Sequence, residues 1–396
     1  MARLKIGMVG AGSGRGQSWM QTLCKLTEHS DLYEFCGFCE VNEDKRAVAQ
    51  QRWGVSGYTT LPELLDEAQP DAVLGAAPPD ANPMIFGVCA ARGVHVITEI
   101  PIAPTIRMAD WMVETARESG IVLEIAEQVW LWAPEQLKRK IIEEGCIGEP
   151  QHSRLWYTNK ADYHGINGLR MLVPGDVERV LGASGEVEIP PFKHFAGGTL
   201  TEDRWDLGVF EFSSGVHCIF ESPPRMRMSR RWDVEGNEGQ LVGETLYIGN
   251  TQDFVQYDIV SEYEEVDGEQ VLKHVRVDTD PPIIFESPHP QWLPDSGDEV
   301  ARMDLLEDFH QAIVGQGAEP RYGPANAIRD IEILFAIRES DRRGRGWLEL
   351  PLEKPTPLER EIEDAYLESY GDWTDPESLV NVPFPQGGVR FEVANW

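Results

Sequence analysis

Residues 4–16 of the chain read LKIGMVGAGSGRG, and this stretch decides the fold. The apolar run LKIGMV predicts a short buried β-strand, and the apolar spacing that follows the glycines predicts a helix. Glycines let the backbone approach a pyrophosphate closely, and the N-terminus of the helix presents free N–H groups to it. The alternative is a glycine-rich turn without a ligand. The stretch predicts dinucleotide binding through Gly10, Gly12, Ser13, Gly14, Arg15 and Gly16.

Glu40 ends the next apolar strand-like run, residues 34–40. In a dinucleotide-binding unit, a carboxylate at this place accepts hydrogen bonds from the ribose hydroxyls and repels a 2′-phosphate. Glu40 therefore favours NAD over NADP as the cofactor. Lys45 and Arg46 follow directly and keep NADP open as the alternative.

The pattern of the whole chain indicates two domains and an extension. Strand-like and helical runs alternate up to residue 125, which is typical of a doubly wound parallel sheet whose strand C-termini bind ligands. After Gly148, strand-rich segments broken by turn signals predict a mostly antiparallel sheet. We therefore expect an α/β protein with a Rossmann domain, a substrate and oligomerisation domain with a large open sheet, and a C-terminal extension, at residues 1–125, 126–350 and 351–396.

The composition excludes several function classes. The chain has 396 residues and a formal net charge of −32, so its surface repels nucleic acids and anionic lipids. No apolar run is long enough to span a membrane, and the first residues lack the pattern of a signal peptide, so we expect a cytoplasmic protein. The nine histidines show no paired spacing, and no metal site is predicted.

Several motifs, in order, resemble the Gfo/Idh/MocA family of glucose–fructose oxidoreductase and inositol dehydrogenase. They are the glycine loop, DAVLGAAPPDANPMIFGVCAARGVHVITEIP, EEGCIGEP and the segment from DLLEDFHQAI to IEILFAIRES. The resemblance implies hydride transfer between NAD(P) and a carbinol carbon of a sugar or polyol. It also places further residues at the cofactor, namely Ala77, Pro78, Asn82, Glu99 and Gln128.

One position departs from the family pattern. The family motif Glu-Lys-Pro, whose lysine handles the hydroxyl proton, reads Glu99-Ile100-Pro101 here. Isoleucine transfers no proton, so another group must replace the lysine. The resemblance matches His164 to a catalytic histidine of the family, and neutral histidine accepts a proton near neutral pH. Tyr163 is the second catalytic candidate.

Nearby residues suit a substrate with many hydroxyl groups. Lys160 and Arg170 are candidates for binding it, with a surface salt bridge as the alternative for Arg170. Trp130 and Trp156 suit stacking on a sugar ring, although core packing explains such residues equally well.

Three functions remain open from the sequence. The first is an NAD-dependent oxidoreductase acting on a sugar or glycoside, with C3 as the expected carbon. The second is a redox-neutral glycosidase that works by oxidation, elimination, hydration and re-reduction, because the NAD-dependent α-N-acetylgalactosaminidases of the same fold also lack the lysine and carry a His-Gly pair like 164–165. The third is a non-catalytic NAD-binding sensor or scaffold. In each case we expect a homodimer or homotetramer.

Overall fold

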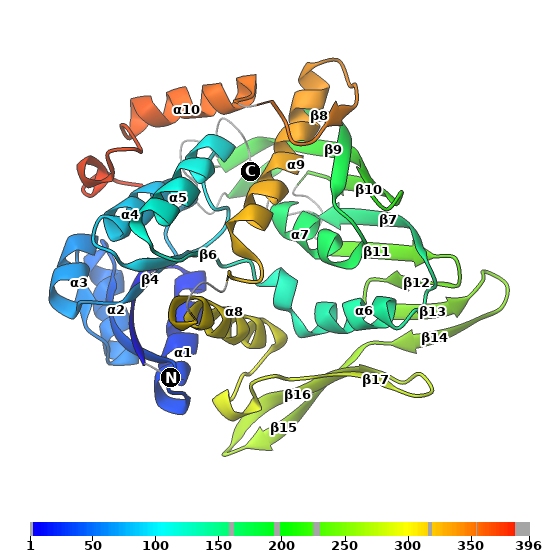
Figure 1. The fold of residues 1–396 in the computed structure, drawn as a ribbon, viewed down its shortest axis with the longest axis horizontal. Helices are drawn as coiled ribbons and strands as arrows, with labels where there is room; N and C mark the ends of the chain where they lie inside the picture. The colour runs from blue at the N-terminus through cyan, green and yellow to red at the C-terminus, as the bar shows by residue number, and fades with distance from the viewer. Residues whose placement is uncertain are drawn as a thin grey trace.

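The computed structural model describes residues 3–157, 162–193, 199–224, 230–315, 319–353 and 355–384. It contains one parallel sheet, one large mixed sheet and one small antiparallel sheet, with helices packed on and between them (Figure 1). The predicted fold class, a doubly wound parallel sheet followed by a large, mostly antiparallel sheet, is confirmed. The domain boundaries at 125/126 and 350/351 stay a prediction.

The first sheet is parallel and has the strand order β3-β2-β1-β4-β5-β6. Its strands are β1 (Leu4–Val9), β2 (Tyr33–Cys39), β3 (Gly57–Tyr58), β4 (Ala72–Gly75), β5 (His95–Thr98) and β6 (Leu123–Ile125). The central strands are apolar and buried because helices cover both faces of the sheet. These helices are α1 (Gly14–His29), α2 (Glu43–Trp53), α3 (Leu61–Ala68), α4 (Asn82–Ala90) and α5 (Ile106–Ser119). The strand order reverses between β1 and β4, which is where such sheets bind ligands.

The second sheet has nine strands in the order β14-β13-β12-β11-β7-β10-β9-β8-β18. All of its neighbouring pairs are antiparallel except β7 with β10. The strands are β7 (Pro150–Tyr157), β8 (Val177–Lys193), β9 (Thr199–Phe212), β10 (His217–Ser222), β11 (Arg230–Gly236), β12 (Gly239–Val242), β13 (Thr245–Gly249), β14 (Phe254–Asp258) and β18 (Leu348–Glu349). A separate three-stranded sheet, which the sequence did not predict, contains β15 (Val260–Val266), β16 (Glu269–Val277) and β17 (Ile283–Glu286).

Helices join the two halves of the molecule. The long helix α9 (Gly323–Arg342) packs against β6 of the first sheet and β8 of the second (Figure 1). The remaining helices near this junction are α6 (Ala133–Glu143), α7 (Asp162–Leu172) and α8 (Gly297–Val314). The N-terminus of α8 lies near α1, so the second half of the chain reaches the glycine-rich loop. No helix in the described part of the chain is both long and apolar enough to cross a membrane.

The C-terminal extension packs on its own chain. Carboxylates of helix α10 (Pro357–Ser369) accept hydrogen bonds from the N-terminal end of α5. For example, the backbone N–H of Ile106 donates to Glu359. Farther along, the ring of Pro376 packs against Gly87 of α4. Apolar and charged partners on the Rossmann helices of the same chain therefore hold these segments. Residues 385–396 lie outside the described part.

Candidate cofactor and active site

The glycine-rich loop joins β1 to α1 and is too tightly packed for side chains at two positions. Gly10 has a φ of 93°, and a Cβ there would collide with the carbonyl group of Ala76. A Cβ at Gly16 would collide with the backbone of the loop itself. Ser13 caps α1 by accepting a hydrogen bond from the N–H of Gly16 over 2.9 Å. A Cβ at Gly14 would meet no atom within 4 Å, so this side of the loop is open and fits the approach of a pyrophosphate.

Glu40 lies beside this loop, where it follows β2. A Cβ at Gly12 would lie 2.5 Å from its Oε2 atom, so the loop and the carboxylate touch. Its Oε1 atom accepts a hydrogen bond from the backbone N–H of Asn42 over 3.0 Å. The guanidinium of Arg46 donates to the backbone carbonyl of Glu40 over 2.7 Å and does not bind its carboxylate. This arrangement fits a ribose beside the loop, and the preference for NAD over NADP stays a prediction.

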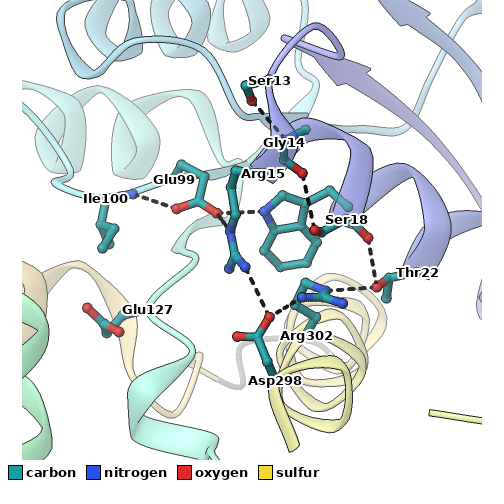
Figure 2. A network of polar contacts seen from close by, with 12 residues as sticks. Ser13, Gly14, Arg15, Ser18, Thr22, Glu99, Ile100, Glu127, Asp298 and Arg302 are labelled. Atoms are coloured by element: carbon teal, nitrogen blue, oxygen red, sulfur yellow. Dashed lines mark hydrogen bonds and ion pairs between the residues drawn. The ribbon is translucent and has the colours of Figure 1, made fainter. Parts of the chain in front are cut away.

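Glu99 follows β5, and its carboxylate receives two side-chain hydrogen bonds from α1. Its Oε1 atom accepts from Nε of Arg15 and from Nε1 of Trp19, each over 2.6 Å (Figure 2). Its Oε2 atom accepts from the backbone N–H of Ile100 over 3.3 Å. The sequence shows no positive charge beside Glu99, but the fold brings Arg15 to it from the glycine-rich loop.

Arg15 connects the loop to the second half of the chain. Its Nη1 atom donates to Asp298, in the first turn of α8, over 3.2 Å, and Arg302 of the same helix pairs with this aspartate (Figure 2). Burial lowers the pKa of Arg15, but the charges of Glu99 and Asp298 outweigh it and raise the pKa above its usual value. The side chain of Arg15 is therefore a bridging cation, and its contact with the cofactor stays a prediction. No local sequence pattern indicated that Asp298 or Trp19 would lie in this network.

Two buried amide oxygens at the edge of the first sheet fit a donor from the cofactor. Asn82 is fully buried and donates through Nδ2 to the carbonyl oxygens of Glu99 and Pro101, each over 2.9 Å. Its Oδ1 atom, like Oε1 of Gln128, has no hydrogen-bond partner among the described residues. The carboxamide N–H group of a nicotinamide is such a donor. Ala77 and Pro78 follow β4 at the same edge.

His164, in the first half of α7, pairs with a carboxylate that the sequence analysis missed. Its Nδ1 atom lies 2.9 Å from both carboxylate oxygens of Glu127, which follows β6 and is 1% exposed. Glu127 also accepts from the backbone N–H of Val129 over 2.9 Å, which fixes its orientation. A carboxylate at Nδ1 favours the tautomer that carries its proton there, so Nε2 is free to accept one. A carboxylate directly after β6, as Glu99 is after β5, was the signal that could have identified it.

Tyr163 lies next to this pair. Its ring centroid is 5.1 Å from that of His164, and its ring packs against the main hydrophobic core. Burial, together with the charges of Glu127 and then Glu99, raises the pKa of Tyr163 well above its usual value of 10. The phenol is therefore protonated at neutral pH, which suits a hydrogen-bond donor better than a base.

Arg170 is occupied by protein carboxylates. It donates to Asp330 of α9 over 2.6 Å and to Asp176 over 3.3 Å, and its side chain is 10% exposed. The hydroxyl of Tyr322 also donates to Asp330 over 2.6 Å. This buried network joins α7 to α9, so the guanidinium contributes to packing between helices, and its role in substrate binding stays a prediction.

The remaining candidates are dispersed. The ring of Trp130 packs against Tyr322, with 5.9 Å between ring centroids, whereas Trp156 lies on β7 opposite Arg231 of β11. Lys160 lies outside the described residues. Within the described part, His289, Asp304 and Glu307 bring three potential metal ligands within 4.8 Å of one another, but Arg321 pairs with Asp304 over 3.0 Å. That the protein binds no metal therefore stays a prediction from the sequence.

Comparisons with known proteins identify the cofactor-binding domain. Residues 4–127 match an oxidoreductase family with an NAD-binding Rossmann fold, GFO_IDH_MocA. A 1,5-anhydro-D-fructose reductase from Ensifer adhaerens is 26% identical over 48% of this chain and 61% of its own length. The glycosyl hydrolase family 109 protein 2 from Akkermansia muciniphila is 26% identical over 40% of this chain and 34% of its own. The chain thus spans about three fifths of the first relative and a third of the second.

A solved structure extends the likeness of the fold to most of the chain. The structure of levoglucosan dehydrogenase in complex with NADH and levoglucosan superposes with a TM-score of 0.67 at 19% identity, over 88% of this chain and all of that one. Residues 4–127 thus form an NAD-binding Rossmann domain of the Gfo/Idh/MocA oxidoreductase family.

Proposed function

We propose that the protein oxidises a carbinol carbon, with C3 as the expected position, of a sugar or glycoside. The observation that carries the proposal is the Glu127–His164 pair at the junction of the two halves. Ile100 occupies the place of the usual proton-handling lysine and provides no base. A histidine held by a buried carboxylate supplies one.

Each residue of the site has a separate role in the proposed oxidation. The glycine-rich loop and Glu40 would hold NAD, which would supply the hydride acceptor for the carbinol carbon. His164 takes the hydroxyl proton at Nε2, and Glu127 holds the ring and stabilises the imidazolium that forms. Tyr163 donates a hydrogen bond to a substrate oxygen. Glu99 and Gln128 line the nicotinamide end, and Lys160, Arg170, Trp130 and Trp156 are the candidates for binding the substrate.

Similarity to other proteins supports the substrate class. The first relative is named a reductase of an anhydro sugar, and the structural neighbour was solved with levoglucosan. The test is turnover of the full-length chain with NAD on levoglucosan, methyl glycosides and p-nitrophenyl glycosides. We expect NADH to appear with at least one substrate. Absence of NADH and of released p-nitrophenol throughout, with NAD still bound, would favour the non-catalytic sensor or scaffold.

A redox-neutral glycosidase is the second candidate, and Ile100 is the observation that favours it. The likeness to a glycosyl hydrolase family 109 protein points the same way. A ketone at C3 acidifies the C2 hydrogen, so this enzyme would exchange that hydrogen with deuterium in heavy water and accumulate little NADH. A dehydrogenase gives stoichiometric NADH and a ketone product whose glycosidic bond is intact, whereas the glycosidase releases the aglycone. Mass spectrometry of the product, beside NADH absorbance, separates the two reactions.

A further inference from the structure

A cavity of about 250 Å³ lies between α6, β11 and the N-terminus of α8. Trp132 and Trp232 form part of its lining, with ring planes 22° apart and centroids separated by 6.5 Å. Glu135, Lys138 and Gly297 contribute further to the lining. The volume is below the range of about 300–1,000 Å³ that is typical of drug-sized ligands, so the cavity suits a single ring.

Side-chain contacts connect the lining of the cavity to the proposed active site on two sides, and the second connection runs through Tyr157, whose ring centroid lies 6.4 Å from that of His164. On one side, Asp298 accepts a hydrogen bond from Nε1 of Trp132 over 3.1 Å and another from Arg15 over 3.2 Å, and Arg15 holds Glu99 at the end of β5. On the other side, the ring of Trp232 stacks on Tyr157, with 6.3 Å between centroids. A ligand that extends beyond the reacting sugar ring therefore has a place to bind that adjoins both the cofactor end and the α7 end of the site.

The charges around the cavity favour a neutral ligand. Lys138 pairs with Glu135 over 2.7 Å, and both side chains are about 95% buried. Arg231 is held by both carboxylate oxygens of Asp233 over 2.9–3.0 Å. Among the described lining residues each cation thus has a carboxylate partner, and a phosphate would meet no free positive charge. The apolar surface of the indole rings and the carboxylate acceptors instead suit an uncharged ring, with or without hydroxyl groups.

We propose that this cavity binds an uncharged ring attached through the glycosidic oxygen to the sugar that is oxidised. The substrate would then be a neutral glycoside and not a free monosaccharide or a nucleotide sugar. This inference rests on the proposed function, because it assigns the second part of the same substrate. The ring has two sources, a second sugar or an aromatic aglycone, and the experiment includes both.

Gly297 allows a direct test. A Cβ there would make only ordinary contacts, the nearest at 3.5 Å from the ring of Pro134, so Gly297→Ala fits, and Gly297→Leu adds bulk at the cavity wall. Binding to the full-length, NAD-supplemented protein is measured by calorimetry and saturation-transfer NMR. The probes are methyl glycosides of glucose, galactose and N-acetylgalactosamine, their p-nitrophenyl counterparts, and the disaccharides cellobiose, maltose and lactose. Thermal melting checks that both variants fold.

We expect at least one two-ring probe to bind about tenfold more tightly than its methyl glycoside, an advantage of about 1.4 kcal/mol. Gly297→Ala should keep this advantage and Gly297→Leu should remove most of it. Equal binding of one-ring and two-ring probes, or an advantage that persists in Gly297→Leu, would overturn the proposal. So would binding of UMP or inorganic phosphate that Gly297→Leu abolishes. Two-ring binding without any NADH formation would count against the proposed oxidation and leave the cavity assignment intact.

Discussion

At the scale of single residues, His164 is the group on which the proposed chemistry depends. Removing a positioned base costs about 10²–10⁴ in rate. We predict that His164→Ala loses turnover by this factor and keeps its affinity for NAD, because no contact of this side chain involves the glycine-rich loop. Glu127→Gln should lower turnover less and change its pH profile, because the ring loses its fixed orientation.

His217→Ala is the matched control, since this histidine pairs with Glu211 of β9 and is 54% exposed. Steady-state kinetics and NAD calorimetry on the three variants test the assignment. If His164→Ala is fully active in both the NADH assay and the heavy-water assay, the assignment is wrong whichever reaction occurs.

Glu40 carries the prediction about cofactor choice. Its carboxylate gains hydrogen bonds from the ribose hydroxyls of NAD and meets like charge in the 2′-phosphate of NADP. We predict at least about a tenfold preference for NAD, about 1.4 kcal/mol, and Glu40→Ala should weaken NAD binding and narrow this gap. Calorimetry with both cofactors measures it. Equal affinities in the wild type would reject the role of Glu40.

The buried carboxyl group of Glu124 should make the free energy of unfolding depend on pH. Its side chain is fully buried, its Oε2 atom has no partner among the described residues, and burial raises its pKa to about 8. The folded state therefore holds this proton over a pH range in which the unfolded chain has released it. Stability from this group is present at low pH and falls as the pH rises from about 4.5 to about 8, by at most about 1.4 kcal/mol per pH unit.

Glu124→Gln should remove this dependence and be relatively more stable above pH 8. Urea unfolding at pH 5, 7 and 9 measures the effect, with Glu118→Gln, 66% exposed, as the control. Parallel pH dependences for the wild type and Glu124→Gln would contradict the prediction.

At the scale of elements, the C-terminal extension supports the turn that leads into Asn82. The hydroxyl of Tyr370 donates to the buried carboxylate of Asp80 over 2.8 Å, and that of Tyr366 donates to its backbone carbonyl over 2.9 Å. Asn82 holds the backbone at Glu99 and Pro101 by hydrogen bonds. Loss of order in the turn should therefore also disturb the edge of the sheet where we expect the cofactor.

We predict that Tyr370→Phe lowers the free energy of unfolding by about 1–3 kcal/mol, since a buried carboxylate loses a donor, and weakens NAD binding severalfold. Denaturant unfolding and NAD calorimetry measure the two effects. Tyr263→Phe, on an exposed strand at 47% exposure, is the control and should change neither. A loss of stability with unchanged NAD affinity would limit the extension to a structural role.

At the scale of the whole molecule, the large sheet leaves apolar side chains on one face. Leu207 of β9 and Ile219 of β10 are 42% and 39% exposed, and Val187 of β8 is 37% exposed. The register of these strands puts the three side chains on the same face, away from the helices. Exposed apolar surface of this kind marks an interface between proteins.

We predict a homo-oligomer, at least a dimer, that uses this face. Ile219→Glu should shift the protein to the monomer in light scattering at micromolar concentration, whereas Val260→Glu on the small sheet should not. A monomeric wild type under the same conditions would contradict the prediction.

Sequence signals predicted much of the fold because they act locally. Helix α2 coincides with the helical spacing of residues 43–53, and Thr105 caps α5 while Gly120 ends it at a φ of 68°. Two helices were missed although their caps were readable, since Thr60 with Glu63 and Thr356 with Glu359 each form a capping box. The small third sheet and the 17-residue β8 were missed because strand partners are chosen across the fold and leave no local signal.

The features of the candidate site also fall into those that the sequence determined and those that only the tertiary structure decided. By itself the sequence determined the strand–glycine–helix unit, Glu40 at the end of β2 and the replacement of the lysine by Ile100, because each depends on neighbouring residues and their spacing. Only the tertiary structure decided what Glu99 and His164 pair with. Arg15 and Glu99 are 84 positions apart, and Glu127 and His164 are 37 apart. Such pairs form because the parallel strands of the first sheet end at one edge and α7 packs beside that edge. No local sequence pattern specifies which distant charged side chain will lie next to Glu99 or His164.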